Sequence, residues 1–104
     1  MSNVHPFEGE KMGHGDTLRF WDDYADMYSS MQQGDIPQRV VRILSDEGYL
    51  AEDSTVLELG SGPGTYSLLV APCVRGLTCM DTSPRMLDRL MASASERGIG
   101  NITP

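Results

Sequence analysis

The sequence predicts an α/β fold built around a doubly wound parallel sheet, and three observations support this prediction. Apolar runs typical of strands occupy residues 55–59 and 77–81. Residues 65–76 separate a glycine-rich turn from the second run, and that length is about the minimum for a right-handed crossover to a parallel strand. Helix signals lie before the first run and after each of the two. In such a fold the ligand binds at the carboxyl ends of the strands.

Two helices are expected before the first strand. The first begins near Asp16, a good capping residue, and ends at residues 33–34. Its apolar stripe consists of Trp21, Tyr24, Tyr28 and Met31, with Phe20 and Met27 beside it. The second helix begins after Asp35, with Pro37 in its first turn, and ends near Gly48. The side chains that it is expected to bury are Ile36, Val40, Ile43 and Leu44.

Two further helices are expected to cover the sheet. A short one follows Gly64 and ends at Pro72, which cannot continue a helix. The pair at residues 83–84, Ser-Pro, is a strong helix start, and that helix ends at Gly98. Residues 99–104 resemble the approach to a third strand, so the sheet is expected to have two to three strands. The predicted divisions are a flexible N-terminal arm at residues 1–15, a helical cap at 16–50 and a partial core at 51–104.

Composition excludes several function classes. The formal net charge is −7, and no cluster of Lys and Arg is present, which argues against a nucleic-acid partner. No apolar run is long enough to span a membrane and no leader is readable, so we expect no membrane partner and a cytoplasmic location. Cys73 and Cys79 lack metal or redox spacing. They are therefore expected to be reduced thiols, and no metal site is predicted.

Residues 56–64 are the most informative segment of the chain. Gly60, Gly62 and Gly64 alternate there after the acidic Glu58. A backbone without side chains can lie flush against a ligand, because a Cβ would occupy the space of the ligand or strain the turn. The second strand ends on Asp81, which brings a second carboxylate to the same sheet edge. Three alternating glycines exceed what a simple strand-to-helix turn needs, so the pattern favours a ligand site.

Two motifs resemble those of class I (Rossmann-like) S-adenosylmethionine-dependent methyltransferases. Residues 58–64 match the E/D-x-G-x-G-x-G pattern of that family, and residues 81–87 match its D-x-S-x-x-M-L pattern. Both motifs in this order are more specific than a glycine loop alone. Residues 20–28 also resemble the N-terminal cap helix of members that act on small molecules. The resemblance covers residues 16–103, but only the N-terminal half of the domain of the family.

The resemblance implies S-adenosylmethionine as the cofactor. The glycine loop would line its methionine and ribose portion, Glu58 would face its ammonium group, and Asp81 would accept hydrogen bonds from both ribose hydroxyls. The last role also follows from chemistry, because the two oxygens of a carboxylate can bind a vicinal diol. No residue qualifies as a general base, so catalytic residues are not assigned. The predicted cofactor-binding residues are Glu58, Gly60, Ser61, Gly62, Gly64, Asp81, Thr82, Met86 and Tyr28.

Several of these residues have alternative roles. Asp81 could instead cap the helix that starts near Ser83, although Ser83 already supplies a cap. The family places part of its first helix over the cofactor, which suggests Tyr28, or else Tyr24, although aromatic residues at helical spacing more often belong to a core. Thr82 stands where a larger apolar side chain often packs on adenine, so that contact is expected to be weaker. The acids of the first helix are expected to form a solvated face: Asp22, Asp23 and Asp26.

A nicotinamide dinucleotide site is an alternative within the same architecture. Such sites favour G-x-G-x-x-G, in which the last glycine lets the helix pack closely and its N-terminus meet a pyrophosphate. Here the spacing is G-x-G-x-G and Thr65 follows it. S-adenosylmethionine has no phosphate and carries a sulfonium cation, which suits the acidic site better.

The sequence thus predicts the cofactor-binding portion of a methyltransferase that acts on an unknown, small-molecule acceptor. The alternatives are a non-catalytic S-adenosylmethionine-binding or assembly module and a domain without a ligand. The family has further strands, and a sheet of two strands is only marginally stable because its open edges favour pairing. We therefore expect either a fragment or an assembly, as a homodimer or with a complementing polypeptide.

Overall fold

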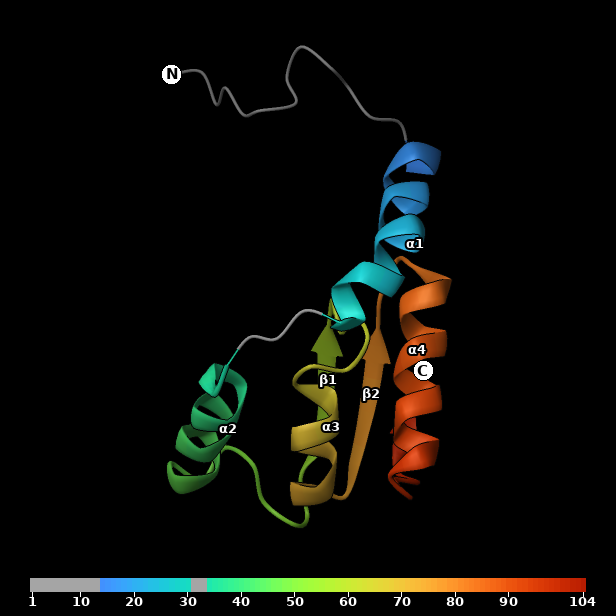
Figure 1. Cartoon of the computed structure of the whole chain (residues 1–104). Helices are drawn as coiled ribbons and strands as arrows, with labels where there is room; N and C mark the ends of the chain where they lie inside the picture. The colour runs from blue at the N-terminus through green and yellow to red at the C-terminus, as the bar shows by residue number, and fades with distance from the viewer. Residues whose placement is uncertain (1–13, 31–33) are drawn as a thin grey trace, which may run out of the picture.

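The computed structural model describes residues 14–30 and 34–104, which form an α/β arrangement (Figure 1). Residues 1–13, and with them most of the predicted arm, lie outside the described part. A short 3-10 helix, η1 (Ala71–Cys73), contains Pro72. In chain order the elements are α1 (His14–Ser30), α2 (Ile36–Asp46), β1 (Thr55–Leu59), α3 (Ser67–Val70), η1 (Ala71–Cys73), β2 (Gly76–Met80), α4 (Pro84–Glu96) and β3 (Ile102–Thr103).

The strands of the described chain form one parallel sheet in the order β1-β2-β3. Leu57 of β1 lies opposite Thr78 of β2, and Leu77 of β2 lies opposite Ile102 of β3. β1 has the predicted bounds, β2 starts and ends one residue earlier than predicted, and β3 confirms the strand expected after residue 99. The predicted α/β class with a short parallel sheet is therefore confirmed.

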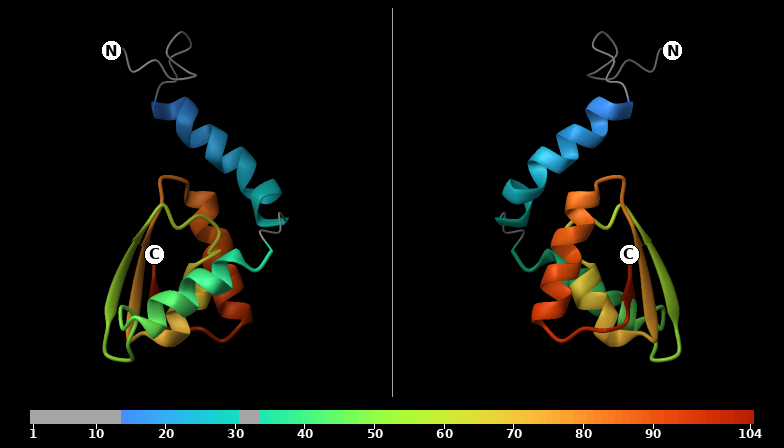
Figure 2. Two further views of the ribbon diagram at one scale, coloured as in Figure 1. Left: turned by 90° about the vertical axis from the view of Figure 1, so that its left-hand side faces the viewer. Right: turned by 90° about the vertical axis from the view of Figure 1, so that its right-hand side faces the viewer.

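The helices α2, α3 and α4 lie on one side of the sheet (Figure 2). This is the arrangement of one βαβαβ half of a doubly wound sheet. On the opposite face, Leu57, Leu59 and Met80 are 58%, 72% and 53% exposed. Parallel sheets are usually covered on both faces, so this bare apolar face is a distinctive feature of the described chain.

The main core lies between the sheet and these helices. Leu90 of α4 is completely buried, and burying a side chain of this size contributes roughly 1.5–3 kcal/mol. Val41 brings α2 into the same cluster. The buried residues of the cluster are Val41, Leu68, Val70, Ala71, Val74, Leu77, Cys79, Leu90, Ala94 and Ile102.

Both predicted end signals of α4 are confirmed. Ser83 is the N-cap, and its Oγ accepts a hydrogen bond from the Met86 amide at 3.2 Å. At the other end Gly98 has a φ of +68°, and the amide of Ile99 donates to the carbonyl of Ala94 at 2.9 Å. These bonds satisfy backbone groups that the helix itself leaves without partners. The start of α4 is therefore well defined, which matters because it borders the candidate site.

The prediction for the buried face of α2 was wrong for three of its four residues; Leu44 is half-buried. Ile36, Val40 and Ile43 are 57%, 37% and 60% exposed, whereas Pro37 and Val41 are buried. Two neighbouring stripes of this helix are apolar, and periodicity alone does not say which one faces inward. α2 packs against α3, and that contact selects the stripe that carries Val41.

Candidate functional site

The glycine loop between β1 and α3 has two kinds of glycine. Gly60 and Gly62 have φ values of +67° and +59°, and a Cβ added at either would meet no atom within 4 Å. Their role in the loop is conformational, because other residues rarely adopt such φ values. Gly64 also has a positive φ, +101°, but a Cβ there would lie 3.1 Å from Leu68 Cγ and 3.2 Å from Leu90 Cγ. Gly64 therefore allows close packing of the loop on the core.

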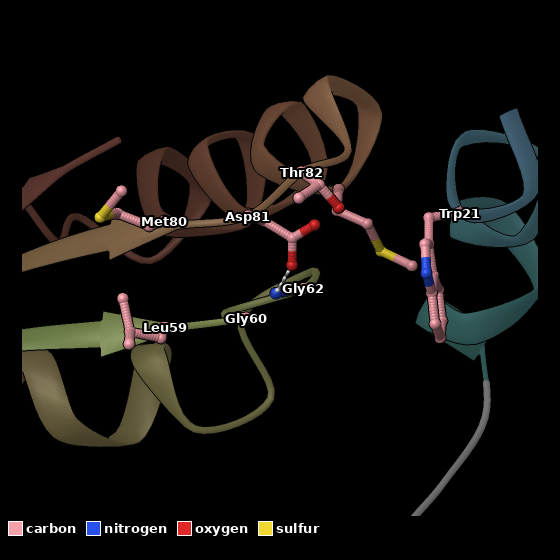
Figure 3. Close-up of a pocket in the computed structure, with 8 residues that line it drawn as sticks. Trp21, Leu59, Gly60, Gly62, Met80, Asp81 and Thr82 are labelled. Atoms are coloured by element: carbon pink, nitrogen blue, oxygen red, sulfur yellow. Dashed lines mark hydrogen bonds between the residues drawn. The ribbon is translucent and has the colours of Figure 1, made fainter. Parts of the chain in front are cut away.

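The carboxylate of Asp81 joins this loop to the turn after β2. Its Oδ2 accepts a hydrogen bond from the Gly62 amide at 2.8 Å (Figure 3). Its Oδ1 accepts one from the Ser83 amide at 2.9 Å, so Asp81 also shapes the start of α4. The Ser61 amide donates to the Met80 carbonyl at 3.0 Å, which fixes the two segments further. Each oxygen of Asp81 has a second lone pair available for a ligand.

A pocket of about 480 Å³ lies at the carboxyl ends of β1 and β2 (Figure 3). Pockets for small organic ligands are typically roughly 300–1,000 Å³ and mostly apolar, with few polar groups. Trp21 forms one wall and comes from α1, across from the strand ends. The complete lining consists of Trp21, Leu59, Gly60, Gly62, Met80, Asp81, Thr82 and Met86. The site is thus an apolar pocket with one carboxylate.

Five of the nine predicted cofactor-binding residues line this pocket: Gly60, Gly62, Asp81, Thr82 and Met86. Glu58, Ser61 and Gly64 do not line it, although they belong to the same loop or the strand before it. Tyr28 lies in α1, but its side chain is outside the described part of the structure. The contact of each of these residues with a cofactor stays a prediction.

The Glu58 side chain lies on the helix side of the sheet. Its Oε1 accepts a short hydrogen bond from the Ser67 hydroxyl, and the Cys79 Sγ lies 3.7 Å from the same oxygen. Burial raises the pKa of the Cys79 thiol, and the Glu58 carboxylate raises it too, whereas hydrogen bonds with Ser61 and Ser67 act against them. Cys73 and Cys79 are both free, as predicted. The Glu58 side chain is therefore held by contacts with the start of α3 and with β2.

Sequence reasoning missed three residues of the pocket wall: Trp21, Leu59 and Met80. Trp21 was assigned to an apolar stripe expected to be core, yet it is 38% exposed. Leu59 and Met80 are the last residues of adjacent strands, and the register pairs them on the bare face of the sheet. Their position directly before Gly60 and Asp81 is the signal that could have identified them.

Asp22 corrects the expectation of a solvated acidic face on α1. Its Oδ1 accepts a short hydrogen bond from the Ser83 hydroxyl and another from the Arg85 amide at 3.4 Å. Asp23 is exposed, as expected. The side chain of Asp26 is outside the described part of the structure. α1 thus contacts the start of α4 through one of its acids.

Within residues 14–30 and 34–104, no group of side chains could hold a metal ion. In the same part of the chain, no helix has the length and apolar character needed to cross a membrane.

Comparison with known proteins identifies relatives in structure but not in sequence. No protein-family model matches the chain, and neither does any curated protein sequence. A phosphoethanolamine N-methyltransferase of Haemonchus contortus, solved with phosphoethanolamine and S-adenosylhomocysteine, matches with a TM-score of 0.63 and 22% identity. That match covers 95% of this chain and 23% of the other.

Two further structures match in the same way. The complex of DhpI with SAM and HEP has a TM-score of 0.61 and 21% identity, covering 89% of this chain and 43% of the other. An S-adenosylmethionine-dependent methyltransferase of Clostridium acetobutylicum has a TM-score of 0.57 and 17% identity, covering 83% and 35%. The chain therefore spans less than half of each of these structures.

At such identities the likeness concerns the fold. Over the part that it spans, the chain has the Rossmann-like fold of S-adenosylmethionine-dependent methyltransferases, as its two motifs predicted.

Proposed function

We propose that this chain binds S-adenosylmethionine at the carboxyl ends of β1 and β2 and forms the cofactor-binding portion of a methyltransferase. The observation that carries the proposal is the contact between Asp81 and Gly62. A carboxylate and a backbone free of side chains border the same pocket and are joined by a 2.8 Å hydrogen bond. The fold shared with S-adenosylmethionine-dependent methyltransferases supports it.

The residues of the pocket fit the chemistry of this cofactor. The space beside Gly60 and Gly62 is open, so a ligand can approach the backbone there. Asp81 can accept hydrogen bonds from ribose hydroxyls while it holds the Gly62 amide. Trp21 and Met80 offer apolar surface to a flat adenine ring. When bound, the cofactor would supply a methyl group on a sulfonium, ready for transfer.

In this proposal, the predicted residues that do not line the pocket act indirectly, by supporting the glycine loop or by contacting the cofactor through water. The Ser61 hydroxyl donates to the Glu58 carbonyl at 3.1 Å and so supports the loop from below. Gly64 sets the distance between the loop and α4. Glu58 would reach the ammonium group of the cofactor through water, because its side chain does not line the pocket. By contrast, Thr82 in the turn after β2 and Met86 in the first turn of α4 line the pocket and would contact the adenosyl group directly.

A titration tests the cofactor proposal. We expect saturable, one-site binding of S-adenosylmethionine and S-adenosylhomocysteine, and no saturable binding of NAD, because the loop lacks the glycine spacing that brings a helix N-terminus to a pyrophosphate. Isothermal titration calorimetry on a sample of known mass in solution measures all three. Binding of NAD, or of none of the three, would contradict the proposal.

We propose a small molecule as the methyl acceptor, which the phosphoethanolamine complex of one structural neighbour supports. The alternative is a non-catalytic S-adenosylmethionine-binding module, which would use the same pocket without transferring the methyl group. Methyl transfer to phosphoethanolamine in an activity assay would support the first, because a non-catalytic module transfers no methyl group to any acceptor.

We further propose that the open edge of β1 pairs with a strand from a second copy or from a polypeptide that supplies further strands, and that this partner also covers the bare face of the sheet. Within the described chain, β1 pairs only with β2, so its other edge is available for pairing. Leu57, Leu59 and Met80 form the exposed apolar face beside that edge. An open edge next to an apolar face is a typical site of strand addition.

Leu57→Lys is expected to weaken this association, because a charge in the centre of the apolar face must be desolvated on assembly. Ile43→Lys is the matched control, since Ile43 is similarly exposed, at 60% against 58%, but belongs to α2 on the other side of the sheet. Sedimentation equilibrium over a concentration series measures both. A wild-type chain that is monomeric and unfolds cooperatively by itself would refute the assembly proposal.

A further inference from the structure

α1 is connected to the described body of the molecule through its contact with α4 (Figure 2). Among the described side chains of α1, Ala25 is completely buried, and the larger Phe20 and Trp21 are roughly half-buried, at 49% and 38% exposed. Apolar contacts of this kind hold α1 against the body of the molecule, but they are non-directional, so they do not by themselves fix its orientation. A directional polar contact can do so.

That polar contact is made by Asp22. Its carboxylate lies at the N-terminus of α4, where the partial positive charge of the helix favours an anion. It accepts a hydrogen bond from the Ser83 hydroxyl, and its Oδ1 lies 3.4 Å from the Arg85 amide. Ser83 is completely buried, and its Oγ also accepts from the Met86 amide. Because a carboxylate only accepts hydrogen bonds, the hydroxyl proton of Ser83 is directed at Asp22.

The same turn forms the opposite wall of the pocket. Asp81 accepts a hydrogen bond from the Ser83 amide, and both Asp81 and Met86 line the pocket. Trp21, the residue before Asp22, lines it from α1 (Figure 3). A short polar chain, Asp81 to Ser83 to Asp22, therefore links the strand-end wall of the pocket to the helix that supplies its tryptophan wall.

We propose that Asp22 is a positioning residue that holds Trp21 at the pocket and so keeps the cofactor site closed on the α1 side. This inference rests on the proposed function only for the identity of the ligand. Asp22 itself does not line the pocket, so it acts through Trp21. Without the Asp22 contact, α1 would sample other orientations, and only the fraction with Trp21 in place would bind tightly.

The test uses Trp21 as its own reporter, because the sequence contains one tryptophan. Asp22→Ala is expected to red-shift the Trp21 emission and to increase its quenching by acrylamide in the absence of any ligand. The affinity for S-adenosylhomocysteine is expected to fall about tenfold. Asp22→Asn keeps an acceptor oxygen for Ser83 without the charge, so its effects are expected to be intermediate.

Asp23→Ala is the matched control, since Asp23 is exposed on the same helix and its loss changes the net charge equally. It is expected to match the wild type in all three measurements. Wild-type emission and quenching in both Asp22 variants would overturn the inference. If the wild type binds no S-adenosylhomocysteine, the proposed function fails, but the emission and quenching measurements still decide the role of Asp22.

Discussion

Replacing Asp81 with alanine is expected to lower the affinity for S-adenosylhomocysteine by at least tenfold. A hydrogen bond to a charged group contributes about 1.5–3 kcal/mol, and about 1.4 kcal/mol corresponds to a tenfold change in Kd. Two such bonds to the ribose would be lost together, but hydrogen-bond contributions from one group are not additive. Isothermal titration calorimetry on the wild type and the variant measures the difference.

The substitution has a second consequence, which must be separated from the first. Asp81 also accepts hydrogen bonds from the Gly62 and Ser83 amides, so its removal loosens the loop and the turn. An S-adenosylhomocysteine analogue without the two ribose hydroxyls separates the effects. If Asp81 acts mainly on the diol, the wild type and the variant should bind this analogue with similar affinity. If Asp81 acts mainly on the loop, Asp81→Ala should weaken binding of the analogue as much as it weakens binding of S-adenosylhomocysteine.

Asp88→Ala is a suitable control, because Asp88 is exposed on α4 and its loss changes the net charge by the same amount. It is expected to leave the affinity unchanged. An Asp81→Ala variant with wild-type affinity would remove Asp81 from the site and leave only its structural role at the start of α4.

The sheet and its crossovers were predictable because their signals are local. β1 is an apolar run bounded by turn residues, and the cap of α4 is specified by Ser83 and the proline after it. Each signal depends on residues that are neighbours in sequence. The parallel pairing of β1 with β2 then followed from the length of the crossover, since a connection this short returns to a neighbouring parallel strand.

The buried face of α2 and the role of Asp22 were not predictable in this way. α2 has two apolar stripes, and only its packing against α3 decides that Val41 is buried while Ile43 is exposed. Asp22 and Ser83 are 61 residues apart, and nothing in the sequence near either one indicates the contact. Such pairings are set by tertiary packing, which a helical period does not encode.

Gly64 shows a further limit of sequence reasoning. The alternating glycines look equivalent in the sequence, and all three were assigned to the cofactor. In the structure, Gly60 and Gly62 border open space at the pocket, whereas Gly64 is buried against Leu68 and Leu90. Only the three-dimensional arrangement distinguishes a glycine that leaves space for a ligand from one that leaves space for the core.

Gly64→Ala is therefore expected to lower the free energy of unfolding by about 2–5 kcal/mol. A left-handed backbone costs a residue with a Cβ about 1–2 kcal/mol, and overpacking a core adds about 1–3 kcal/mol. At Gly64 both costs apply, because φ is +101° and the added Cβ would lie 3.1–3.3 Å from carbon atoms of Leu68 and Leu90. Urea unfolding followed by circular dichroism measures the loss.

Gly98→Ala separates the two costs. Gly98 has a φ of +68°, but a Cβ there would meet nothing within 4 Å, so only the backbone cost of about 1–2 kcal/mol is expected. Equal losses in the two variants would show that packing against α4 does not constrain the loop. A larger loss at Gly64 would mean that packing on the core fixes the position of the loop. The position of the Gly62 amide, which donates a hydrogen bond to Asp81, would then also depend on that packing.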